Sequence, residues 1–193
     1  MWPDEYDNDP FVNDGLLLFG TPQLLDNSDV LRFTPSVFYA MAFGPGGLDE
    51  RSTSFYFNRI WSPAGLEIGT ISIRDSGDYQ LFNGGSVAAS LVLHSSDLVD
   101  DGHGPNYLES VTAVGGFSSS TPTGLPFQNW SYTNSIDPAA SFAYLATSVD
   151  LTMSGLLQAS TDAPDHSAFV ARKLSMTVAT AVVPAPAAVW LLG

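Results

Sequence analysis

Residues 77–93 read GDYQLFNGGSVAASLVL, and this stretch favours a β-sheet protein. Two apolar runs flank the pair Asn83-Gly84, which supplies the positive φ angles of a type I′ turn and so predicts a β-hairpin. Similar short runs, rich in the β-branched and aromatic residues that strands favour, recur between turn residues along the chain. The predicted strands are residues 16–19, 30–33, 37–43, 54–60, 66–74, 79–82, 87–94, 107–114, 147–159 and 168–181.

Several of these runs alternate apolar and polar residues, as in TSFYFNRIW at 53–61, which is the period of a strand with one buried face. GPGG at 44–47 and SSSTPTG at 118–124 predict loops, and Asp75 and Asp78 predict a turn before the hairpin. Residues 115–140 are the least regular part and predict a long surface excursion. We find no helical crossovers of the βαβ kind. The chain therefore predicts an all-β fold, an antiparallel β-sandwich with the jelly roll as one such arrangement, as a single domain over residues 1–181.

The composition limits the function classes. The 193 residues include 20 Asp and Glu but only 6 Lys and Arg, a formal net charge of −14. Phosphate binding requires clustered basic residues, so we expect neither nucleic acid nor an anionic lipid surface as a partner. There is no cysteine, which excludes disulfides and thiolate chemistry. The chain opens MWPDEYDNDP, without the features of a signal peptide, so the protein is either cytosolic or a processed or trimmed form.

The last twelve residues, 182–193, read VVPAPAAVWLLG. Pro184 and Pro186 fix φ and form a stiff extended spacer. The seven residues that follow have no polar side chain and are too few to span a bilayer, which takes about 20. On spacing alone this segment is a last apolar strand or an ordered tail.

The same stretch, VPAPAAVWLLG, resembles the start of the PEP-CTERM sorting signal, in which a short proline motif precedes a transmembrane helix and a basic tail. The matching residues are Val183, Pro184, Pro186, Ala187, Ala188, Val189, Trp190, Leu191 and Gly193. Ala185 replaces the glutamate that names the motif, and the rest of the helix and the basic tail do not follow. We therefore interpret residues 182–193 as a truncated signal. DGLLLF at 14–19 and ISIRDSGDYQLF at 71–82 also resemble exported proteins that carry it.

The resemblance implies how the protein is exported and processed, but it implies no enzymatic activity. A Gram-negative bacterium exports such a protein, an exosortase processes it through the full C-terminal signal, and it touches the membrane only transiently through the helix that is missing here. It ends outside the cell or on the outer surface, and proteins of this kind accompany exopolysaccharide production. We expect an exported, non-enzymatic cell-surface or biofilm-matrix protein that associates with exopolysaccharide or with copies of itself.

Two other functions stay open: a carbohydrate-binding module that depends on Ca²⁺, and a polysaccharide-processing enzyme on a jelly-roll scaffold. Carbohydrate modules commonly use exposed aromatic rings as stacking platforms. Trp61, Trp130 and Tyr132 lie near Pro- or Asn-bearing segments and are the candidates for such a platform. Burial in the core is the alternative for each ring, and it is the one we favour because large aromatics mostly bury.

SDLVDDGHG at 96–104 concentrates the carboxylates of Asp97, Asp100 and Asp101 beside Gly, the surroundings of an oxygen-ligand Ca²⁺ site. A solubilising loop with Asp as a turn former is the interpretation we favour. No other cofactor is implied. The histidines, His94, His103 and His166, share no metal-ligand spacing, and no GxSxG elbow is present. We therefore expect incidental surface histidines and name no catalytic residue.

Overall fold

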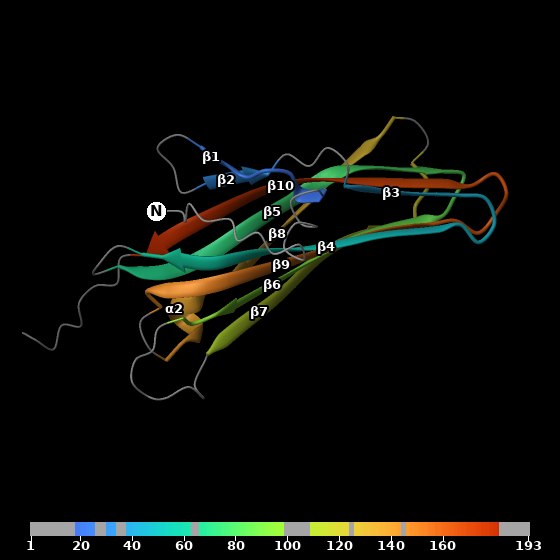
Figure 1. Ribbon diagram of the computed structural model, residues 1–193. Coiled ribbons are helices and arrows are strands. Elements are labelled where there is room, and N and C mark those ends of the chain that lie inside the picture. The colour runs from blue at the N-terminus through green and yellow to red at the C-terminus, as the bar shows by residue number, and fades with distance from the viewer. Residues whose placement is uncertain are drawn as a thin grey trace, which may run out of the picture.

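The computed structural model describes residues 18–25, 30–33, 38–62, 66–98, 109–123, 126–143 and 146–181. Within them the chain forms two antiparallel sheets packed face to face, which confirms the predicted all-β sandwich (Figure 1). The elements are β1 (Gln23–Leu24), β2 (Val30–Phe33), β3 (Tyr39–Phe43), β4 (Leu48–Trp61), β5 (Glu67–Phe82), β6 (Ser86–Ser96), β7 (Ser110–Ser119), β8 (Gln128–Ile136), the short helix α2 (Pro138–Ser141), β9 (Ser148–Ser160) and β10 (Ser167–Ala181).

The first sheet, sheet A, has the strand order β1–β2–β10–β5–β8. β3 also pairs with β10, over Ser167 to Ala171, on the same side as β2. The second sheet, sheet B, has the order β4–β9–β6–β7. Every strand pair in both sheets is antiparallel.

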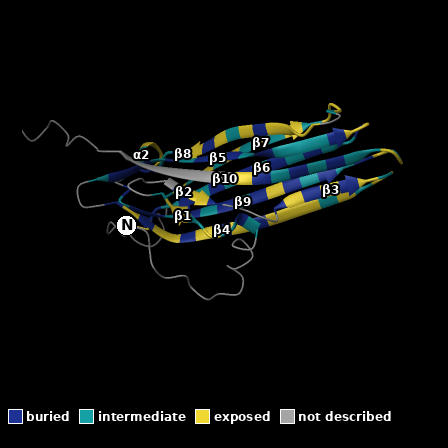
Figure 2. Ribbon diagram, turned by 90° about the horizontal axis from the view of Figure 1, so that it is seen from above, coloured by how far each residue is buried: buried dark blue, intermediate teal, exposed yellow. Residues whose placement is uncertain are grey.

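The alternation of apolar and polar residues produces the sandwich. Along β6 buried and half-buried residues alternate from Ser86 to Ser96, and Figure 2 shows the same banding along neighbouring strands. The inward side chains form one core, to which both sheets contribute leucines, isoleucines and valines. A group of phenylalanines fills one part of this core, with ring centroids 4.8–6.5 Å apart: Phe19, Phe33, Phe38, Phe55 and Phe57. Removal of this apolar surface from water stabilises the fold.

The predicted turn at Asp75 and Asp78 is wrong, because β5 runs without a break from Glu67 to Phe82. Asp75 lies in the middle of that strand with its side chain fully buried, where the Arg172 guanidinium compensates its charge. Gly77 also belongs to the strand and faces Trp130 of β8. Two residues that are typical of turns are therefore held in a strand by partners distant in sequence.

The predicted surface excursion over 115–140 is also wrong. β7 continues to Ser119, into the predicted loop at 118–124, and β8 forms an edge strand of sheet A beside β5. Among the inward positions of β8 are Trp130 and Asn134, and the buried Asn134 amide donates to the backbone oxygens of Leu91 at 2.9 Å and Ala113 at 3.2 Å. Because the polar residue Asn134 occupies an inward position, the sequence of β8 does not show the regular apolar–polar alternation of a strand. At the other end of the chain, residues 18 and 19 are helical, not extended as predicted.

The predicted hairpin at Asn83-Gly84 is half right. The turn exists, with positive φ angles of 60° at Asn83, 159° at Gly84 and 98° at Gly85. However, β5 pairs with β10 and β8 in sheet A, whereas β6 pairs with β9 and β7 in sheet B. The turn therefore carries the chain from one sheet to the other and joins no paired strands.

Two further turns cross between the sheets at the same end of the molecule, which we call the crossover end (Figure 1). The predicted loop at 44–47 joins β3 to β4, and residues 161–166 join β9 to β10. Hydrogen bonds tie the three turns together: the amide N–H of Gly44 donates to the His166 oxygen at 3.1 Å, and Asn83 Nδ2 donates to the Asp165 oxygen at 3.2 Å. Thr161 Oγ1 donates to the Gly44 oxygen at 2.6 Å.

Candidate functional site

The outer face of sheet A carries an exposed apolar surface near the crossover end. Its side chains come from β3, β10, the end of β5 and the residue before β8. Five of the side chains are 41–61% exposed, and Phe169 is half-buried among them. We call this surface the aromatic patch: Tyr39, Met41, Phe43, Phe82, Phe127 and Phe169.

The register of sheet A brings these side chains together. Phe169 of β10 pairs with Met41 of β3, and Ser167 lies between Phe43 of β3 and Phe82 of β5. Side chains two residues apart on a strand point to the same face of the sheet. The patch is therefore assembled from strands that are far apart in sequence, and β10 lies at its centre.

The rings of the patch contact one another. The Tyr39 ring is stacked near Phe169, with centroids 6.0 Å apart and planes 28° apart, and Phe127 meets Phe169 edge-on at 5.5 Å. Further along the same face, Lys173 Nζ lies 2.7 Å from Asp78 Oδ2. Large contiguous apolar surfaces that remain exposed are typical of interaction sites. Exposed flat rings can stack against the apolar C–H face of a sugar ring.

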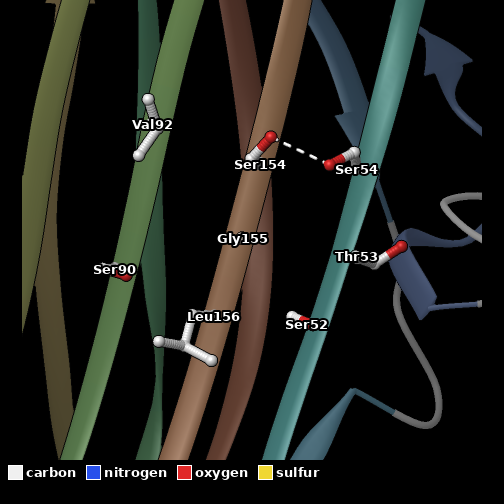
Figure 3. A pocket seen from close by; sticks show the side chains of 8 residues that line it. All are labelled: Ser52, Thr53, Ser54, Ser90, Val92, Ser154, Gly155 and Leu156. Carbon is white, nitrogen blue, oxygen red and sulfur yellow. Dashed lines mark hydrogen bonds between the residues drawn. The ribbon is translucent and has the colours of Figure 1, made fainter.

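The outer face of sheet B is instead rich in hydroxyl groups. A shallow groove of about 350 Å³ crosses β4, β9 and β6 (Figure 3). We call it the serine groove, and it is lined by Ser52, Thr53, Ser54, Ser90, Val92, Ser154, Gly155 and Leu156, none of which is charged. Ser54 and Ser154 point toward each other and share a hydrogen bond of 2.8 Å (Figure 3).

A buried ion pair lies between the sheets, below this groove. Arg172 Nη2 of β10 is 2.9 Å from Asp75 Oδ2 of β5, and neither side chain is exposed. Tyr132 donates its hydroxyl proton to the same carboxylate oxygen at 2.6 Å. Arg172 Nη2 also donates to the backbone oxygen of Ser90 at 2.7 Å, and the guanidinium carbon lies 4.9 Å from the centroid of the Phe38 ring. Arg172 therefore connects sheet A to a strand of sheet B that lines the groove.

Burial raises the pKa of the Asp75 carboxyl above its ordinary value, although the charge of Arg172 and the hydrogen bond from Tyr132 act in the opposite direction. Burial and the neighbouring Asp75 carboxylate also raise the pKa of the Tyr132 hydroxyl. Desolvation disfavours the charged form of a carboxyl group, so this ion pair is costly to maintain at neutral pH.

The raised pKa of Asp75 predicts a pH dependence of stability. The folded chain binds this proton more tightly than the unfolded chain, so the stabilisation is fully present below the unfolded pKa of about 4 and is lost as the pH rises through the folded value. Asp75→Asn removes the ionisation. We expect the stability of the unmodified chain relative to Asp75→Asn to fall as the pH rises above about 4, measured by urea denaturation at each pH. A relative stability that increases with pH would contradict this assignment.

Two of the three aromatic residues predicted to stack on glycans are turned inward. Trp130 is 4% exposed and lies between Phe117 and Tyr132, with ring centroids 5.4 and 5.9 Å away. Tyr132 is half-buried, with its hydroxyl on Asp75. The favoured interpretation, burial in the core, is therefore confirmed for Trp130, and Tyr132 is half-buried beside it at the edge of the sandwich between β7 and β8. Trp61, at the end of β4, is 37% exposed.

The residues predicted to bind Ca²⁺ are only partly described. Asp97 is 5% exposed and forms a β-bridge with Val149, and its backbone N–H donates to the Glu109 oxygen at 2.9 Å. Asp100 and Asp101 lie outside the described residues. In the parts of the chain that the structure describes, no three His, Asp or Glu side chains gather as metal ligands would.

The remaining sequence predictions fall on different parts of the chain. His94 lies on β6, where Nδ1 is 2.8 Å from Thr112 Oγ1, and His166 lies at the crossover end, where Nδ1 is 2.7 Å from Asp162 Oδ1. His103 and the sorting-signal residues at 182–193 lie outside the described residues. None of the helices in the described ranges combines the length and apolar character needed to cross a bilayer.

Comparison with known proteins gives only distant structural similarities. No family model matches the chain, and no curated protein does. Among solved structures, the carbohydrate-binding module TmCBM61 in complex with β-1,4-galactotriose is 13% identical, with a TM-score of 0.31 over 89% of this chain and 98% of that one. Eiger TNF from S. frugiperda is 12% identical, with a TM-score of 0.23 over 77% of this chain and 96% of that one.

The aromatic patch was missed by sequence reasoning. Residues 38–43 read FYAMAF, and an entirely apolar run shows no polar face that would identify the exposed side. The available signal is side-chain size, since Tyr39, Met41 and Phe43 alternate with the small residues Ala40 and Ala42. In the structure the alanines are buried and the large residues are exposed.

Proposed function

We propose that this chain is an exported, non-enzymatic protein of the cell surface or biofilm matrix, and that it associates with exopolysaccharide through the aromatic patch. The observation that carries the proposal is the cluster of exposed rings around Phe169 on sheet A. The resemblance of residues 182–193 to an exosortase-processed signal supports export. In this proposal the protein is a carbohydrate-binding domain without a reaction of its own.

The charge of the molecule indicates which polysaccharide suits the patch. With a formal net charge of −14, the protein repels polyanions at low ionic strength. The patch itself contributes stacking surface and the Tyr39 hydroxyl, and none of its six side chains is charged. We therefore assign it neutral sugar chains, whose C–H faces stack on rings and whose hydroxyl groups point away to water.

Co-sedimentation of the 193-residue protein with insoluble polysaccharides tests the proposal. We expect saturable binding to a neutral polymer among cellulose, xylan and β-mannan, and weaker binding to an insoluble anionic polymer, carboxymethyl-cellulose resin, at low salt. Parallel arms with Ca²⁺ and with chelator test the sequence prediction for Asp97, Asp100 and Asp101, since loss of binding in chelator would single out that loop for mutation. No binding to any neutral polymer or to exopolysaccharide from the host overturns the proposal.

Changes within the patch are expected to weaken binding. Phe169→Ser removes the ring that contacts both Tyr39 and Phe127. Loss of one stacked ring costs roughly 0.5–1.5 kcal/mol, so we expect Kd for the bound polymer to rise up to about tenfold. Tyr56→Ser is the matched control, because Tyr56 is 39% exposed on sheet B. Trp61→Ser is measured beside it, as a test of the sequence-based candidate. Equal losses for Phe169→Ser and Tyr56→Ser would exclude the patch as the site.

A further inference from the structure

We infer that the serine groove on sheet B is a second site for a neutral sugar chain, so that one molecule bridges two polysaccharide chains. This inference rests on the proposed function and extends it from one face of the sandwich to both. The aromatic patch and the serine groove lie on the outer faces of opposite sheets.

The charge distribution around the groove defines the class of ligand. The molecule has a net charge of −14, yet no side chain that lines the groove is charged. Two acidic side chains on the same face of the sheet already accept hydrogen bonds from the protein. Glu50 Oε1 accepts from Gln158 Nε2 at 2.5 Å, and Asp150 Oδ2 accepts from the Tyr56 hydroxyl at 3.2 Å. An uncharged groove in an acidic protein is suited to a neutral ligand. An acidic ligand would find no basic side chain in the groove lining to balance its charge.

The lining offers hydrogen-bonding groups that the protein leaves unused. Among the described residues, the hydroxyls of Ser52 and Ser90 have no protein partner, and the hydrogen bond between Ser54 and Ser154 leaves both oxygens able to accept another. Leu156, which is 36% exposed, supplies an apolar contact beside them. Hydroxyl groups interspersed with small apolar surface fit a polyhydroxylated ring better than a peptide or a lipid.

The register places these groups in rows across the strands. Ser52, Leu156 and Ser90 are opposite one another on β4, β9 and β6, and Ser54, Ser154 and Val92 form the next row. Neighbouring strands in a sheet are about 4.8 Å apart. A sugar chain laid across the strands therefore meets a hydroxyl or an apolar side chain at each strand that it crosses.

The floor of the groove is held rigid from inside. Arg172 Nη2 donates to the backbone oxygens of Ser90 at 2.7 Å and Leu156 at 3.4 Å, on the two strands that form the floor. A site that is ordered before binding loses less conformational entropy when the ligand arrives. The buried ion pair is thus a positioning device for the groove, although its side chains do not reach the ligand.

Titration calorimetry with cellohexaose, xylohexaose and mannohexaose tests the second site. We expect two sites per chain for the unmodified protein and one for Ser90→Leu, which fills the groove. Ser118→Leu is the matched control, because Ser118 is an exposed residue of β7 on the same sheet that does not line the groove. Ser52→Leu serves as a second filling variant, and urea denaturation checks that each variant is folded.

Bridging is measured separately, as the viscosity of a soluble glucomannan mixed with the protein. We expect the unmodified chain to raise the viscosity, and we expect Ser90→Leu and Phe169→Ser each to reduce that rise at the same protein concentration. A single site that is lost in Phe169→Ser and unchanged in both groove variants overturns the second site and leaves the proposed function intact. Absence of binding to every oligosaccharide and polymer overturns both.

Discussion

Arg172→Met is expected to lower the free energy of unfolding by about 3–5 kcal/mol at neutral pH, because it leaves the Asp75 carboxylate buried without a counter-charge. That loss is a large fraction of the 5–15 kcal/mol that roughly holds a domain folded. The hydrogen bond to the Ser90 oxygen is lost as well, so the connection from β10 to sheet B weakens. Urea denaturation at pH 7 measures the change, and a loss below about 1 kcal/mol would contradict this account of the ion pair.

The double variant Arg172→Met/Asp75→Asn separates loss of the charge pair from loss of packing. The amide of Asn has no charge to compensate, and its oxygen can still accept the proton of Tyr132. We expect the double variant to be more stable than Arg172→Met alone, and the four proteins of the cycle give the coupling energy directly. A double variant that is the least stable of the four would show that the guanidinium acts mainly through its contacts with Phe38 and Ser90.

Gly77→Ala is expected to be comparably severe, at about 3 kcal/mol or more. A Cβ atom at this position of β5 would collide with the backbone oxygen of Ala171 on β10 and with the Trp130 ring on β8. Backbone atoms of a central strand cannot move aside as a surface side chain can, and overpacking of a dense interior costs about 1–3 kcal/mol even where some adjustment is possible. Urea denaturation followed by tryptophan fluorescence, to which the buried Trp130 contributes, measures the change.

Ser72→Ala is the control for this substitution. Ser72 belongs to the same strand and is half-buried on its outward face. Substitutions at such positions usually change stability by no more than about 0.5 kcal/mol. If Gly77→Ala and Ser72→Ala destabilise equally, the close approach of Trp130 to the β5 backbone has no energetic significance.

The predictions that succeeded depended on local chemistry. Regular alternation located β4, β6, β9 and β10 and the all-β class, and the glycines at 44–47 and 83–85 located two turns. The strand predictions that failed share one cause: the residues concerned are held in place by partners that are distant in sequence. Asp75 belongs to a strand only because Arg172, almost one hundred residues later, supplies its counter-charge. Asn134 is buried only because the oxygens of Leu91 and Ala113 face it.

The candidate sites could not be predicted from the sequence for the same reason. The patch requires the register of β3, β5 and β10, and the groove requires that of β4, β9 and β6, and neither register can be read from one strand alone. The turn at Asn83 misled for a related reason. Positive φ angles specify a reversal of the chain, but the choice between pairing in one sheet and crossing to the other depends on which strands arrive later.

The central position of β10 has a consequence for how the molecule is made. This strand follows the other described strands in sequence, yet β2, β3 and β5 pair with it, and it contributes the buried arginine. A chain emerging from a ribosome therefore cannot complete sheet A until Ser167 to Ala181 have been synthesised. Such late, long-range pairing slows folding and extends the time during which unpaired strands are accessible to chaperones.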